Sequence, residues 1–134
     1  MSILITPEKI TELADNEVFC FGSNRAGKHG RGAALIAARK FGARYGQGNG
    51  LMGQSYGIST KDEKLRVLSL REIGVQVERY LRFAAAHPEL HFLTTKIGCG
   101  LAGFAEKEIA PLFGAAKDIP PNVSLPASFI PYLS

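Results

Sequence analysis

Twice along this chain an apolar, strand-like run leads through a glycine-rich turn into a helix-forming segment. The first copy runs from residues 18–21 through 22–32 into 33–41. The second runs from residues 92–97 through 98–103 into a helix that begins near Glu106. Strands that alternate with helices are typical of the α/β class, with strands that are at least partly parallel. In such sheets, ligands bind in the turns outside the carboxyl ends of the strands.

Two further helices are predicted from their start signals. The pair Thr6-Pro7 predicts a helix that ends near residue 15, because threonine caps a helix and proline suits its first position. Ser69 and Glu72 have the spacing of a capping box and predict a helix that ends before Pro88.

The remaining segments complete a single domain. Short strands are predicted at residues 3–5, 55–60 and 123–125, and the glycine-rich stretch 46–53 predicts a loop. No linker, internal repeat or low-complexity segment interrupts the chain. We therefore expect residues 1–134 to form one domain, a length near the modal size of a domain.

Charge and cysteine content limit the classes of partner. Sixteen basic and twelve acidic residues give a net charge of +4, which suits a phosphate, a nucleotide or nucleic acid, and which equally serves solubility. Cys20 and Cys99 belong to no CxxC pair and no zinc-like cluster, so we expect reduced thiols, no metal and no cofactor. No apolar run reaches 18 residues, so we expect a cytoplasmic protein without a membrane partner.

The glycine-rich turns are suited to phosphate. Glycine lets backbone N–H groups approach phosphate oxygens closely, and a helix N-terminus adds favourable partial charge. Neither turn is a Walker A sequence or a GxGxxG fingerprint. A structural role as plain tight turns remains the alternative.

Two motifs resemble those of the macrodomain family. The run Phe21-Gly22-Ser23-Asn24, followed by Gly30-Arg31-Gly32 and an alanine-rich helix, resembles the first half of a macrodomain ligand cleft. Residues 96–104, KIGCGLAGF, resemble the phosphate loop of the terminal ADP-ribose protein glycohydrolases, where Ile-Gly-Cys-Gly-Leu is typical. The likeness extends over residues 18–113. It implies a three-layer α/β/α fold with a mixed, partly parallel central sheet that binds ADP-ribose.

The resemblance also implies which residues bind the ligand. Asn24 would face the distal ribose, and residues 98–101 would wrap the diphosphate with backbone N–H groups. Gln54 and Ser55 follow Gly53 into a strand expected beside the cleft, where they can hydrogen-bond a ribose. The predicted ligand-binding residues are Gly22, Ser23, Asn24, Gly30, Gly32, Gln54, Ser55, Gly98, Cys99, Gly100, Leu101 and Gly103.

Two positions bear on hydrolysis. Lys61 resembles the lysine nucleophile of the glycohydrolase branch, a role that requires a pKa lowered by burial or a cationic neighbour. Pairing with a phosphate, with Asp62 or with Glu63 is the alternative. Ala102 stands where that branch has a catalytic aspartate, and alanine cannot exchange a proton. The chain is therefore expected to hydrolyse weakly or not at all.

Three other positions have open roles. His29 lies in the first turn and can act as an acid or base, contact phosphate, or simply be solvated. The Cys99 thiol is a nucleophile only if its turn is not explained by backbone shape. Glu8-Lys9 replaces the early Gly-Asp with which many macrodomains read adenine, so the base is left open.

Three functions follow in order. The first is a module that binds ADP-ribose or a related nucleotide, free or attached to a protein or nucleic acid. The second is an ADP-ribosyl hydrolase that uses Lys61 and His29. The third is a basic nucleic-acid or protein interaction domain, with Arg25, Lys28 and Arg31 as its charged face.

Overall fold

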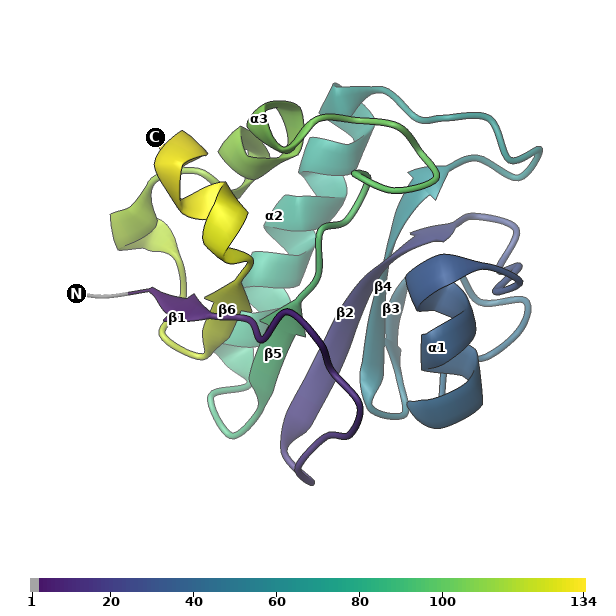
Figure 1. The fold of residues 1–134 in the computed structure, drawn as a ribbon, viewed down its shortest axis with the longest axis horizontal. Coiled ribbons are helices and arrows are strands. Elements are labelled where there is room, and N and C mark those ends of the chain that lie inside the picture. The colour runs from purple at the N-terminus through teal and green to yellow at the C-terminus, as the bar shows by residue number, and fades with distance from the viewer. Residues whose placement is uncertain (1–2) are drawn as a thin grey trace.

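A computed structural model describes residues 3–134 as one six-stranded sheet with helices on both faces (Figure 1). In chain order the elements are β1 (Leu4–Ile5), β2 (Glu17–Asn24), α1 (Gly32–Lys40), β3 (Gly50–Met52), β4 (Ser55–Lys61), α2 (Leu70–Ala86), β5 (His91–Thr94), α3 (Glu106–Ile109) and β6 (Val123–Leu125). Short 3₁₀ helices occupy Ala110–Phe113, Ala116–Asp118 and Ala127–Tyr132.

The sheet is mixed and mostly parallel. Its strand order is β1-β6-β5-β2-β4-β3, and every neighbouring pair is parallel except β3 and β4. The predicted α/β class with a partly parallel sheet is confirmed. Strand β2 lies at the centre, between β4 and β5, and the chain leaves β2 toward α1 and leaves β5 toward α3.

The side chains of β2 show why helices cover both faces. Val18 and Cys20 belong to the larger apolar cluster, which contains residues of α2 and α3. Phe19 and Phe21 belong to the smaller cluster, which contains residues of α1. Successive side chains of a strand point to opposite faces, so α1 and α2 cover different sides of the sheet. The four consecutive apolar residues are buried on both faces, as predicted.

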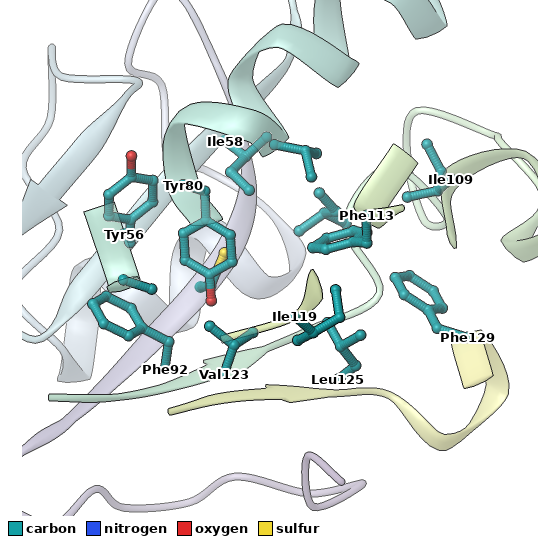
Figure 2. Packing of buried hydrophobic residues seen from close by; sticks show 14 of the residues in the cluster. Tyr56, Ile58, Tyr80, Phe92, Ile109, Phe113, Ile119, Val123, Leu125 and Phe129 are labelled. Carbon is teal, nitrogen blue, oxygen red and sulfur yellow. The ribbon is translucent and has the colours of Figure 1, made fainter. Parts of the chain in front are cut away.

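Aromatic rings fill the larger cluster (Figure 2). Tyr56, Tyr80 and Phe92 gather at one end of it, with ring centroids 4.9 Å apart for Tyr56 and Tyr80 and 5.7 Å for Tyr80 and Phe92. Phe113 and Phe129 lie at the other end, 5.8 Å apart. Such rings contribute most of the burial energy of a core. They hold α2 and the segment after α3 against the sheet and so fix where the turn after β5 lies.

The helix predicted from the capping box is present as α2. The Ser69 hydroxyl accepts a hydrogen bond from the Glu72 amide at 3.1 Å, and the Glu72 carboxylate accepts one from the Ser69 amide at 3.2 Å. Helix α1 also lies where the alanine-rich run predicts it. Of the helices in residues 3–134, none is both long and apolar enough to cross a membrane.

The helix predicted after Thr6 is wrong, because residues 6–14 form an extended segment. The Thr6 amide donates to the Leu125 carbonyl at 2.9 Å and thus prolongs the pairing of β1 with β6. Strand β1 is at the sheet edge and β2 lies three positions inward, about 14 Å away at usual strand spacing. The strands run the same way, so the link must also return to the start of β2. A helix advances only about 1.5 Å per residue and is too short for this path.

Three element boundaries also differ from prediction. The stretch 46–53, predicted as a loop, contains the edge strand β3. Strand β5 ends at Thr94, where the next residues turn to bond back to β2 and to themselves. The helix at Glu106 has only four residues before it tightens into a 3₁₀ helix that contains Pro111. Proline lacks the N–H that an α-helix needs there.

Candidate functional site

A cavity of about 430 Å³ lies at the carboxyl ends of β2, β4 and β5. The turn after β2 leads to α1 on one face of the sheet, and the turn after β5 leads to α3 on the other. The two turns therefore diverge and leave a crevice, as expected where strand order reverses. Twenty residues line it: Gly22, Ser23, Asn24, Lys28, Gly30, Arg31, Gly32, Ala33, Ala34, Tyr45, Thr60, Lys61, Leu65, Thr95, Lys96, Ile97, Gly98, Gly100, Leu101 and Ala102.

Asn24 shapes the turn that follows it. Its side-chain Nδ2 donates to the Lys28 carbonyl at 2.8 Å, and its Oδ1 accepts from the Lys28 amide at 2.9 Å. Asn24 lines the cavity as the motif predicts, and its amide is engaged with its own turn. Each group keeps one further hydrogen-bonding position, so a contact to a ligand remains compatible with this role.

The N-terminus of α1 presents free N–H groups to the cavity. Arg31 at the N-cap makes no side-chain capping bond, and the first turn contains no acidic residue. The N–H groups of Gly32, Ala33 and Ala34 have no hydrogen-bond acceptor within the described part of the chain. All three residues line the cavity. Unpaired N–H groups and the helix dipole together favour an anion at this end of α1.

The turn after β5 presents a second set of free N–H groups. Hydrogen bonds from the amides of Cys99, Gly103 and Phe104 to the carbonyls of Lys96, Gly100 and Gly98, at 3.1, 3.0 and 2.9 Å, fix the turn. The N–H groups of Gly98, Gly100, Leu101 and Ala102 have no acceptor in residues 3–134, and these four residues line the cavity. The two turns thus direct unpaired donors into one space.

The charged side chains around this space are all basic. Lys28, Arg31, Lys61 and Lys96 line the cavity, and the lining includes neither aspartate nor glutamate. Lys96 pairs with Glu106 behind the turn at 3.3 Å. The electrostatic character of the cavity therefore matches a phosphate or another anion.

Lys61 lies at the end of β4 and faces this cavity. The carboxylates next to it in sequence are engaged elsewhere, Asp62 with Arg66 at 3.2 Å and Glu63 with Arg25 at 3.9 Å. No carboxylate within residues 3–134 forms an ion pair with Lys61. Of the two roles that the sequence leaves open, pairing with Asp62 or Glu63 is not observed.

His29 is buried beneath the first turn, with only 2% of its surface exposed, and it does not line the cavity. Its Nε2 lies 2.8 Å from the Arg44 carbonyl and 3.0 Å from the Gln47 carbonyl. Carbonyl oxygens only accept, so Nε2 carries the proton. An acid, base or phosphate contact needs a ring that reaches the ligand. This ring instead ties the first turn to residues 44–47, and the solvated alternative is also excluded.

Gln54 and Ser55 lie away from the cavity. They stand at the start of β4, one strand length, roughly 20 Å, from its carboxyl end. The Gln54 side chain donates to the carbonyls of Ala14 and Glu17, and the Ser55 hydroxyl donates to Met52. The prediction placed them beside the cleft because it did not take account of which end of the strand faces it.

Cys99 and Gly103 also do not line the cavity, although they belong to the turn. Burial, and secondly the nearby Glu106 carboxylate, raises the pKa of the Cys99 thiol to about 11. The thiol is therefore protonated at neutral pH, and a protonated thiol is a poor nucleophile. The turn contributes backbone groups to the cavity rather than this side chain.

Several lining residues escaped the sequence analysis. Thr60 and Thr95 directly follow or end the strands whose tips form the cavity, and this position is a usable signal. Tyr45 and Leu65 come from separate loops and carry no motif, so only the tertiary structure brings them here.

A second groove of about 920 Å³ adjoins the cavity. The two spaces share Gly32, Ala33, Thr95 and Lys96 as lining residues. The groove lies between the extended segment after β1, helix α1 and residues 126–128. Its lining includes Glu8 and Lys9, in the stretch where the macrodomain resemblance would place base recognition.

Two findings limit how the site can be interpreted. Across the described residues, no group of three or more His, Cys, Asp and Glu side chains is arranged to hold a metal ion. Comparison of the chain with family models, with curated proteins and with solved structures finds no match. The chemistry of the site is therefore argued from the cavity and from the two motifs that shape it.

Proposed function

We propose that the cavity binds the diphosphate and distal ribose of ADP-ribose, or of a related phosphorylated nucleoside, with weak or no hydrolysis. One observation carries this proposal: free N–H groups from the start of α1 and from the turn after β5 face a single cavity lined by basic residues. Two adjacent phosphates need two sets of donors, which this arrangement supplies. The same reasoning explains phosphate binding at helix N-termini and glycine-rich turns generally.

The adjoining groove supports a ligand of dinucleotide length. A diphosphate in the cavity would sit beside Gly32 and Lys96, which also line the groove, so its nucleoside half has a continuous path. Apolar residues such as Phe19 and Ile36 line the groove and suit a base. Glu8 offers a carboxylate acceptor to an exocyclic amine, a group that adenine shares with other bases.

The residues of the cavity support binding more strongly than turnover. Lys61 is available there, but no carboxylate lines the cavity and Ala102 occupies the position where the glycohydrolase branch has its aspartate. General acid–base help contributes roughly 10²–10⁴-fold to such reactions. We expect little release of ADP-ribose from an ADP-ribosylated protein, and faster release by Ala102→Asp. Robust turnover that Lys61→Ala leaves unchanged would contradict this part of the proposal.

Calorimetric titration with ADP-ribose, ADP and AMP tests the binding proposal. We expect ADP-ribose to bind most tightly, because it alone fills both phosphate positions and the ribose position. Gly100→Val should weaken this binding by tenfold or more. A Cβ at Gly100 meets no atom within 4 Å, so the substitution leaves the fold intact and obstructs only the approach to the turn.

Cys99→Ser is the matched control, since its side chain lies outside the cavity. It should leave the affinity within about twofold. Equal and weak binding of all three ligands would contradict the proposal and favour the basic interaction domain. A loss in Cys99→Ser as large as that in Gly100→Val would contradict the backbone account of the turn.

A further inference from the structure

Three exposed apolar side chains surround the basic cavity. Tyr45, Leu65 and Leu101 line it while 73%, 43% and 61% of their surfaces remain exposed. They come from three separate segments: the loop after α1, the hairpin after β4 and the turn after β5. We call these three residues the apolar rim. Exposed apolar groups that gather at a concave site mark a contact surface for something bound there.

Leu65 is held on this rim at a cost in backbone energy. It is the one non-glycine residue of the described chain with a positive φ, at 62°. The hairpin around it is closed by pairing of Lys61 with Val67, and the Asp62 carboxylate accepts from the Arg66 amide at 2.9 Å. A left-handed leucine is disfavoured, and such residues cluster where a site requires a particular side-chain position.

Tyr45 is exposed but rests on a fixed support. The His29 ring meets it in an edge-to-face arrangement, with centroids 6.2 Å apart and planes at 76°. His29 is itself fixed by hydrogen bonds to the carbonyls of Arg44 and Gln47. An exposed aromatic ring on a rigid support is suited to stacking against a flat heterocycle, whatever its exact structure.

Resting on the proposed function, we propose that the apolar rim holds a flat, uncharged heterocycle carried on the distal ribose of the ligand. The natural ligand class is then a dinucleotide with two rings rather than ADP-ribose alone. Leu65 follows Lys61 on the same hairpin, which puts the rim on the side of the cavity assigned to the distal ribose. The charged residues that line the cavity are all basic, so a cationic ring is repelled and a neutral ring is favoured.

Titration of the full chain with NADH, NAD⁺ and ADP-ribose tests this inference. NADH carries an uncharged ring, NAD⁺ a cationic ring and ADP-ribose none. We expect NADH to bind about tenfold more tightly than ADP-ribose, within the range that stacking on an aromatic side chain supplies, and more tightly than NAD⁺. Tyr45→Ala should abolish the advantage of NADH while ADP-ribose affinity changes by less than about twofold. Tyr45→Phe should retain that advantage.

Two further variants complete the test. Leu65→Asn keeps a residue that tolerates a positive φ and removes the apolar surface, so it should lower NADH affinity without loss of thermal stability. Tyr132→Ala removes an exposed tyrosine outside the cavity and should change neither ligand.

Three outcomes overturn the inference. ADP-ribose binding as tightly as NADH shows that the rim contacts no ring, and a preference for NAD⁺ over NADH shows that the ring is not selected as uncharged. Equal losses for both ligands in Tyr45→Ala show that Tyr45 only shapes the cavity. In each of these cases binding of ADP-ribose leaves the proposed function standing. Absence of binding by all three ligands contradicts the diphosphate site and this inference with it.

Discussion

The two glycine-rich turns face one cavity, yet they are held in different ways. The first depends on side chains: the Asn24 amide binds the Lys28 backbone, and the buried His29 ring binds two carbonyls of residues 44–47. The second depends on backbone hydrogen bonds within the turn. Gly98 adds a close approach there, with a left-handed φ of 73° and Ile109 against it.

This difference teaches where each turn is vulnerable. The first turn needs particular polar side chains, since without them its many glycines leave the backbone free to move. The second needs the absence of side chains at defined positions. A change of side chain in the first turn and an added Cβ in the second should therefore have the largest effects, and the reverse changes should be mild.

The largest effect is expected for His29→Ala. The change empties a fully buried position and leaves the carbonyls of Arg44 and Gln47 without their donor. Loss of packing and of hydrogen bonds together should lower the free energy of unfolding by about 2–4 kcal/mol, measured by chemical denaturation. The corresponding change in the second turn, Cys99→Ala, should cost less than about 1 kcal/mol. Equal losses would remove the distinction between the turns.

A smaller loss is expected for Gly98→Ala. An added Cβ would lie 2.9 Å from the Ile109 Cδ1 atom and would have to adopt a φ of 73°. The left-handed conformation alone costs roughly 1–2 kcal/mol for a residue with a Cβ. Gly100→Ala is the matched control within the same turn, because its Cβ would meet open space. If both variants unfold at the same denaturant concentration, the constraint on Gly98 has been misjudged.

The smallest effect concerns the Cys99 thiol. Burial raises its pKa from 9.0 to about 11, so the protonated form is favoured in the folded protein. Its contribution to stability is then complete below pH 9 and is lost as the pH rises through 11. Alkylation by iodoacetamide should stay slow at pH 8 and accelerate only toward pH 11, followed by mass spectrometry. Fast alkylation of Cys99 below pH 9 would indicate a thiol more exposed than this turn allows.

Much of the fold follows from local signals in the sequence. The apolar run at 18–21, the capping box at Ser69 and the alanine-rich helix each combine a clear pattern with a clear boundary, and all three are present. The segment after Thr6 has a helix-start signal of similar quality and is extended. Its conformation is set by the distance between two strands that are not neighbours, and no local pattern encodes that distance.

The candidate site shows the same limit. The motif residues Asn24, Gly32 and Gly100 meet at one cavity because parallel strands end at the same edge. Ser55 was expected among them from its neighbourhood in sequence, but its place at the beginning of β4 puts it at the far edge. His29 was taken as a surface or ligand-facing residue because polar loop residues usually are. Its burial results from contact with residues 44–47, which only the tertiary fold determines.

The central claim is that backbone N–H groups from both turns hold one diphosphate, and NMR observation of those groups tests it most directly. ADP-ribose is titrated into ¹⁵N-labelled protein, and the amide resonances are followed. The account predicts that the amides of Gly32 and Ala33 at the start of α1 shift together with those of Gly100 and Leu101, while Ser55 at the opposite edge of the sheet does not respond. Shifts confined to one of the two turns, or centred on Ser55, would contradict it.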